Sequence, residues 1–223
     1  MTRTCLKNRI LPAYSRGEEI FNSVTHIVGG AWGIATLVMC ILVSIFKGNA
    51  LSLACGIIFG VSMIALYSIS SIYHALPCGT AKKVFQVLDH CTIYLLIAGT
   101  YTPMLLCSLM KVAPVAAWGT LIAVWGLAVL SVTLNAIDLK KYKVFSMIGY
   151  VGMGWAIIFN IGSMYQALGK SGFALLLGGG ILYTVGILFY KIGSKKKYFH
   201  SVFHIFVLLG SLLHSLSVIL YTL

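Results

Sequence analysis

The sequence predicts an all-α membrane protein, a bundle of seven transmembrane helices. Of its 223 residues, 60% are hydrophobic and only 9% are charged, whereas a soluble domain carries about 25% charged residues. The hydrophobic residues also gather in seven long runs that short polar loops separate. We therefore expect a basic cytoplasmic tail over residues 1–17, followed by one seven-transmembrane domain over residues 18–223.

Each run is close to the roughly 20 residues that cross a bilayer as a helix. The first run ends at Lys47-Gly-Asn, the second at Pro77-Cys-Gly, and Lys111 with Pro114 separates the third from the fourth. Lysine-rich loops precede the fifth and seventh runs. The expected spans are residues 20–46, 51–76, 86–109, 113–134, 144–165, 171–190 and 199–222.

Cationic residues concentrate on one side of this predicted bundle. The tail and the second, fourth and sixth loops carry thirteen of the sixteen Lys and Arg residues, and the other side carries Lys47, Lys111 and Lys170. Because cytoplasmic loops are enriched in Lys and Arg, the N-terminus is predicted to be cytoplasmic and the C-terminus outside. This orientation excludes a G-protein-coupled receptor. The net charge of +12 then indicates topology and contact with anionic lipids rather than nucleic-acid binding.

The N-terminus and the cysteines give no sign of secretion or of a disulfide framework. About the first 16 residues are polar, without the apolar core and small-residue site of a cleaved signal peptide. The six cysteines include no CxxC pair and mostly lie within apolar runs, so we interpret them as packing residues. They are Cys5, Cys40, Cys55, Cys78, Cys91 and Cys107.

Three histidines are predicted to meet near the cytoplasmic face. His200 and His204 lie one helical turn apart at the start of the last run, and His74 lies at the inner end of the second. Asp89, in the first turns of the third run, reaches the same depth. Three neutral imidazoles with a fourth position open are typical of catalytic zinc sites. The alternative is a set of histidines that only hydrogen-bond neighbouring helices.

We predict His74, His200 and His204 as zinc ligands and Asp89 as the general base for a water. A salt bridge from Asp89 to Lys82 or Lys83 is the structural alternative. Ser70, one turn deeper than His74, is expected to bind a substrate oxygen or, alternatively, its own backbone carbonyl.

A polar stripe on the first helix is expected to line the same cavity. The stripe consists of Glu19, Asn22 and His26, which are spaced i, i+3 and i+7 and so lie on one face of a helix. Such a stripe faces the bundle interior rather than lipid. We assign it to support of the ligands or to the cavity wall; plain helix packing is the alternative. His90 points away from Asp89, and His214 lies too far along the last helix to share the metal.

These motifs occur together in a known family. The chain resembles haemolysin III, the bacterial branch of the progestin and adipoQ receptor superfamily, over all seven runs. The resemblance implies a bacterial inner-membrane protein with a cytoplasmic N-terminus and a zinc ion held by His74, His200 and His204. The motifs are Glu19-x2-Asn22-x3-His26, Ser70-Ser-Ile-Tyr-His74-Ala-Leu-Pro, Leu88-Asp89-His90, Ala98-Gly-Thr-Tyr-Thr-Pro103 and His200-x3-His204.

Three functions remain open at this stage. The metal pattern favours a zinc-dependent hydrolase of lipid amides or esters, which agrees with the ceramide-like substrates of distant relatives. A membrane-state sensor or receptor with structural zinc is the second. A pore-forming, cytolytic protein is the third, implied by the family name. Membrane lipids are the expected partners, and no soluble partner is identified.

Overall fold

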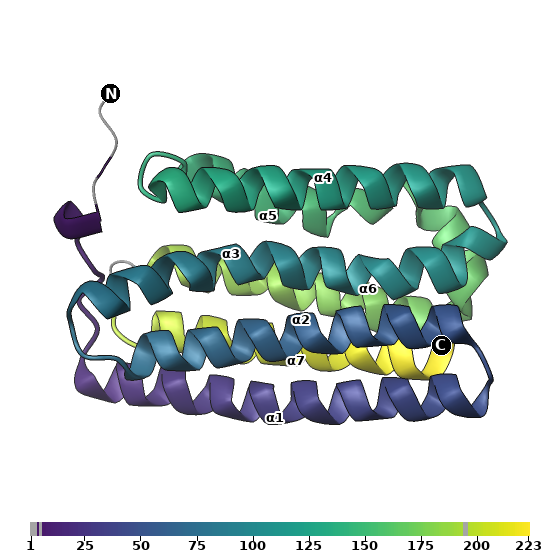
Figure 1. Cartoon of the computed structure of the whole chain (residues 1–223), viewed down its shortest axis with the longest axis horizontal. Helices are drawn as coiled ribbons and strands as arrows, with labels where there is room; N and C mark the ends of the chain where they lie inside the picture. Colours follow the sequence, from purple (N-terminus) through teal and green to yellow (C-terminus); the bar gives the residue numbers. More distant parts are fainter. Residues whose placement is uncertain (1–3, 5, 194–195) are drawn as a thin grey trace.

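The computed structural model describes residue 4, residues 6–193 and residues 196–223; Arg3, Cys5 and Lys195 lie outside the described residues. Long helices lie side by side along one axis, and the two termini lie at opposite ends of the molecule (Figure 1). The main helices are α1 (Arg16–Phe46), α2 (Ala50–Ala75), α3 (Thr80–Pro103), α4 (Pro114–Asp138), α5 (Lys143–Gly154), α6 (Ile161–Gly193) and α7 (Phe199–Ser217). The short helical turns are η1 (Leu6–Asn8), η2 (Met104–Ser108), η3 (Leu109–Lys111), η4 (Ala156–Asn160) and η5 (Val218–Thr222).

The length and apolarity of the helices confirm the membrane class. Among the described residues, six helical segments qualify as membrane spans, not the seven predicted. The count differs because the expected spans 144–165 and 171–190 belong to one helical segment of 51 residues, Lys143–Gly193. That segment is interrupted at Gly169, whose φ of 66° and ψ of 177° are not helical. The six segments are Arg16–Phe46, Ala50–Ala75, Thr80–Lys111, Pro114–Asp138, Lys143–Gly193 and Phe199–Thr222.

Local sequence signals explain where several helices begin. Ser15 and Glu18 form a reciprocal capping box at the start of α1, with Glu18 N–H donating to Ser15 Oγ at 3.3 Å and Ser15 N–H donating to Glu18 Oε2 at 2.9 Å. Asn49 Oδ1 accepts from the N–H of Ser52 at 3.0 Å and caps α2 in the same way. Pro114 occupies the first turn of α4, where its missing N–H costs nothing.

The third helix begins earlier than predicted. It starts at Thr80, so Lys82 and Lys83 lie within α3 rather than in a loop. The helix ends at Pro103, which cannot donate a backbone hydrogen bond, and the chain continues through the π-helical turn η2 and the 3-10 turn η3.

The predicted tail is attached to the bundle. The N–H of Thr4 donates to Asp138 Oδ2 at 2.7 Å, which ties the start of the chain to the end of α4. The first helix begins at Arg16, just inside the stretch expected to be irregular. The segment that precedes α1 therefore has a defined path across one end of the molecule (Figure 1).

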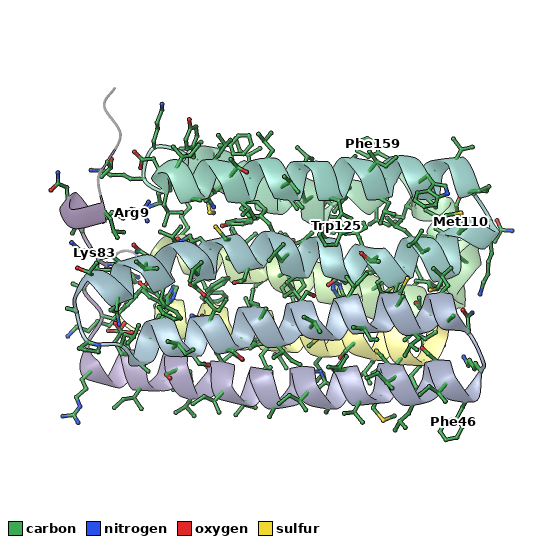
Figure 2. All side chains as sticks on the ribbon, in the orientation of Figure 1. Arg9, Phe46, Lys83, Met110, Trp125 and Phe159 are labelled. Carbon is green, nitrogen blue, oxygen red and sulfur yellow. The ribbon has the colours of Figure 1, made fainter. Side chains whose placement is uncertain are left out.

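The helices pack with their polar and small residues inward. Helices α1 to α4 contact one another in chain order, and α7 packs between α6 and α1. Large apolar side chains such as Phe46 and Phe159 point outward (Figure 2). This is the arrangement of a protein whose surroundings are lipid. The buried face of α1 consists of Glu18, Asn22, Ser23, His26, Gly29, Gly33, Thr36, Cys40 and Ser44.

Close packing of α1 on α2 predicts a large effect of one methyl group. A Cβ added at Gly60 would lie 2.8 Å from the backbone Cα of Leu37, so the two helices would have to separate. We expect Gly60→Ala to lower the free energy of unfolding by about 1–3 kcal/mol, the usual cost of overpacking. Thermal unfolding in detergent measures this loss of stability. Gly126→Ala in α4 is the control, since nothing lies within 4 Å of its added Cβ; equal effects of both changes would contradict the packing.

Candidate metal centre

Three histidines from two helices converge at one end of the bundle. His74 lies in the last turn of α2, and His200 and His204 lie in the first turns of α7. One ring nitrogen from each lies within 4.8 Å of the others, and Nε2 of His200 is 3.1 Å from Nε2 of His204. All three side chains are buried. Such a group can hold a metal ion.

A hydrogen bond deeper in the bundle sets the register between the two helices. Tyr67 precedes His74 by seven residues, and Ser211 follows His204 by seven residues. Tyr67 donates its hydroxyl to Ser211 Oγ at 2.7 Å. Because α2 ends where α7 begins, this bond two turns away holds the histidines at the same depth.

A carboxylate orients His74 from the side opposite the other histidines. Glu19 Oε2 lies 2.7 Å from His74 Nδ1, and Asn22 Nδ2 lies 3.5 Å from the same nitrogen. An ionised carboxylate only accepts, so the contact with Glu19 assigns the proton to Nδ1 and leaves the Nε2 lone pair for a metal; Asn22 Nδ2 is then a neighbour of Nδ1 and not a donor to it. Metal-binding histidines are usually held in this way by a carboxylate or carbonyl.

The polar atoms around the triad fit a bound cation with its water. Among the described residues, Nε2 of His74 and Nδ1 of His204 are buried and have no hydrogen-bond partner. The same holds for Oδ1 of Asn22, both ring nitrogens of His26 and Oγ of Ser201. A buried polar group without a partner costs about 1–3 kcal/mol. The ring of His204 contacts the rings of both His74 and His26, so a polar ligand bound at the triad would satisfy several of these atoms at once.

His26 completes the stripe on α1. Its ring stacks on that of His204, with ring centroids 3.8 Å apart and an interplanar angle of 22°. It also meets the ring of Tyr67 edge-on at 5.1 Å. The three residues of the predicted stripe therefore all contact the triad, Glu19 and Asn22 through His74 and His26 through His204.

Asp89 and Ser70 are not part of the histidine cluster. Asp89 Oδ2 lies 4.0 Å from Nδ1 of its neighbour His90. Lys82, one of the two cations considered for Asp89, binds Glu19 instead at 2.8 Å. Ser70 is buried in α2, while the bond to a carbonyl four residues back is made by its neighbour Ser71, to Tyr67.

The structure adds Tyr14 to this site, which the sequence pattern did not indicate. Its ring stacks on His200 at 4.8 Å and lies 5.8 Å from the ring of His74. Burial raises the pKa of the Tyr14 phenol above its ordinary value, and nearby negative charges, including Glu19 and Asp89, add to the rise. The capping box at Ser15 was the available signal, because it predicts that the chain turns into α1 directly after Tyr14.

A cavity of about 480 Å³ leads from the surface to His74. Lys82 and Glu19 contribute polar walls, and Ile20 and Val24 of α1 contribute apolar walls whose side chains are half-exposed on the outer face. Among the described residues, His74 is the histidine of the triad that lines this cavity, and the half-exposed side chains of α1 bound it on the outer face. The remaining lining residues are Tyr14, Arg16, Ser23, Ala75, Leu76, Pro77 and Cys78.

The sequence is similar to known bacterial proteins over most of its length. The sequence profile of the family described as Haemolysin-III related matches residues 14–215. Hemolysin-3 of Bacillus cereus is 38% identical over 206 residues, 92% of each chain. The Hemolysin-3 homolog of Bacillus subtilis is 39% identical over 194 residues, 87% of this chain and 89% of the relative.

The similarity extends to animal proteins at lower identity. The adiponectin receptor protein of Drosophila melanogaster is 25% identical over 181 residues, which is 71% of this chain and 41% of the receptor. The membrane-spanning helices and the Bacillus relatives establish a multi-pass protein of the bacterial cell membrane. The family match covers most of the chain and all three histidines, and the protein belongs to the haemolysin III-related family.

Proposed function

We propose that His74, His200 and His204 bind one zinc ion and that the protein is a hydrolase acting on a lipid amide or ester. The observation that carries the proposal is the buried convergence of three ring nitrogens within 4.8 Å, with His74 Nε2 free of other partners in the described part of the chain. Ligand nitrogens about 3.4 Å apart would match a tetrahedral ion with Zn–N bonds of about 2.0–2.1 Å. The Nε2 atoms of His200 and His204 are 3.1 Å apart, and the three ring nitrogens lie within 4.8 Å of one another.

Three histidine ligands favour a reactive metal over a closed structural one. Imidazole suits zinc, and structural zinc sites usually use four protein ligands, whereas catalytic sites use three. A zinc ion bound here supplies a Lewis acid that polarises a carbonyl group and acidifies water. The protein itself supplies the orientation of His74 through Glu19 and a buried setting for the three rings.

The surrounding side chains suit an amphipathic substrate. The cavity beside His74 is large enough for a lipid headgroup and opens past Ile20 and Val24, whose faces meet the membrane. We assign Asp89 as the base that takes a proton from the attacking water, and Ser70 as a donor to the substrate. Among the described residues, Oδ1 of Asn22 and both ring nitrogens of His26 are buried without a hydrogen-bond partner next to the triad.

We also infer seven crossings and a cytoplasmic N-terminus. A helix of 51 residues would be about 75 Å long, more than twice the roughly 30 Å hydrocarbon core. Its break at Gly169, and the packing of α5 on α4 but of α6 on α7, support two crossings within this segment (Figure 1). With two crossings there, the lysine-rich loops all fall on the side of the triad.

Two other functions have specific support. The triad links α2 to α7, which favours structural zinc in a receptor, and the Drosophila relative is an adiponectin receptor protein. The name of the Bacillus cereus relative favours cytolysis. A catalytic role is preferred because three ligands and a cavity at His74 are more than a structural ion needs.

Replacing a ligand should remove the metal. We expect about one zinc per chain in detergent-purified wild type, the stoichiometry of a single three-histidine site, and almost none in His74→Ala, His200→Ala or His204→Ala. Elemental mass spectrometry measures the zinc content of each purified protein. His90→Ala is the control, since His90 lies outside the triad and binds the carbonyl of Gln86. Equal zinc in all five proteins would contradict the assignment.

Hydrolysis should depend on both the metal and Asp89. We expect chelation to abolish release of fatty acid from lipid amides or esters, and added zinc to restore it. Asp89→Asn should lower kcat about 10²–10⁴-fold, the usual contribution of a general base, and leave the zinc content unchanged. Turnover is followed by lipid mass spectrometry in proteoliposomes. Metal-loaded wild type without turnover of any lipid class would contradict the hydrolase and favour the receptor.

Cys78 offers a test of orientation without a reporter domain. It is exposed in the loop between α2 and α3, while the other cysteines in the described residues are buried. In a Cys5→Ser background, a membrane-impermeant maleimide should label Cys78 in inside-out vesicles but not in right-side-out vesicles. Adding Lys111→Cys to a Cys78→Ser variant should give the reverse. Labelling of Cys78 from outside would overturn the predicted topology.

A further inference from the structure

Lys82 is buried although it lies in the first turn of a helix at the edge of the membrane. Only 2% of its surface is exposed. Lysine is almost never fully buried unless its charge is paired. By contrast, Lys140 near the same end of the bundle is exposed, as expected for a cation that only marks the cytoplasmic side. The burial of Lys82 therefore calls for a specific role.

The ammonium group of Lys82 has three acceptors. Nζ lies 2.8 Å from Glu19 Oε1, 3.0 Å from the carbonyl oxygen of Leu76 and 3.3 Å from the carbonyl oxygen of His74. An ammonium has three N–H donors, so its hydrogen-bonding capacity is fully used. These acceptors come from α1 and from the end of α2. Lys82 thus joins the first three helices of the chain at a single point.

All three acceptors lead to one imidazole. Glu19 uses Oε1 for Lys82 and Oε2 for His74 Nδ1, so the cation and the ring share one carboxylate. The carbonyl of His74 holds the backbone of the same residue, and the carbonyl of Leu76 holds the turn that follows it. His74 is therefore fixed both at its ring and at its main chain by the same ammonium group.

The position also matches the electrostatics of the helix end. The last carbonyls of a helix lack intrahelical partners and carry partial negative charge, which a cation stabilises. A half-buried carboxylate beside a neutral ring needs a counter-charge as well. Lys82 meets both needs, and in doing so it keeps Glu19 in place as an acceptor for the His74 ring.

We propose that Lys82 is a positioning residue of the metal centre, which aims Nε2 of His74 at His200 and His204 by holding Glu19 and the end of α2. This inference rests on the proposed metal site and assigns a new residue to it. The three acceptors of Lys82 Nζ do not include a free ring nitrogen of a ligand histidine. Its effect on the metal passes through Glu19 and the His74 backbone.

The affinity for zinc, measured by competition with a fluorescent chelator, distinguishes a role in positioning His74 from a role in the stability of the fold alone. We expect Lys82→Met to weaken zinc binding about 10–100-fold, the usual cost of losing a residue that supports a ligand. Glu19→Gln should weaken it to a similar extent. Lys140→Met, which removes the same charge from an exposed position, should leave the affinity unchanged.

A double variant tests whether the two residues act together. If Lys82 acts through Glu19, then Glu19→Gln/Lys82→Met should bind zinc no more weakly than the poorer single variant, because contacting residues are non-additive. A residue that only stabilises the fold would lower the unfolding temperature of the metal-free protein and leave the affinity as in wild type. Lys82→Arg keeps the charge, so its zinc affinity should be closer to wild type than that of Lys82→Met. If Lys82→Met does not fold, Lys82→Arg replaces it in the comparison.

The results of these experiments distinguish a failure of the Lys82 inference from a failure of the proposed zinc site. Wild type that binds no zinc would overturn both. Wild type that binds zinc through the three histidines, with unchanged affinity in Lys82→Met or fully additive losses in the double variant, would overturn the role of Lys82 alone.

Discussion

The hydrogen bond between Glu19 and His74 is the interaction on which the centre depends. Three imidazoles are buried where the polar and small faces of the helices meet, and each ring loses most of its contact with water. One of the three has a carboxylate on its outer nitrogen, and that carboxylate has its own cation. This chain from Lys82 through Glu19 to His74 spans α3, α1 and α2. It makes the position of a single ring nitrogen a consequence of how three helices pack.

The position of His200 in α7 depends on contacts with the segment where α1 begins. Glu18, next to Glu19, closes the capping box of α1 with Ser15 and also accepts from the N–H of Tyr198 at 2.7 Å. Tyr198 has a positive φ of 62° and precedes the first turn of α7, where His200 lies. One acidic residue thus ties the beginning of α1 to the beginning of α7. Tyr14 then packs its ring against His200 from the segment just before the box.

Much of this arrangement could be predicted from spacing and composition. The membrane class follows from low charge, and the level of His74, His200 and His204 follows from helix lengths and loop cations. The stripe of Glu19, Asn22 and His26 follows from helical periodicity, and all three residues contact the triad. The contacts of the stripe could be predicted because distances along a helix are nearly invariant.

The features that could not be predicted are those that depend on contacts between segments. Lys82 resembled any loop cation, because its burial requires knowing that α3 starts at Thr80 and that α2 ends beside Glu19. Tyr14 lay in a stretch without periodicity, so its stacking on His200 had no signal of its own. The predicted number of membrane spans also differs from the six segments found among the described residues. Hydropathy separates residues 144–165 from 171–190, but it cannot show that both belong to one helical segment that is interrupted at Gly169.

X-ray absorption spectroscopy of the zinc-loaded protein in detergent would test the central claim most directly. The account predicts three nitrogen scatterers with the outer-shell pattern of imidazole at about 2.0–2.1 Å and one further oxygen, without sulfur. The imidazole pattern should lose one ring in His74→Ala. A first shell of oxygen atoms alone, or one containing sulfur at about 2.3 Å, would show that the metal binds elsewhere and would contradict a three-histidine centre.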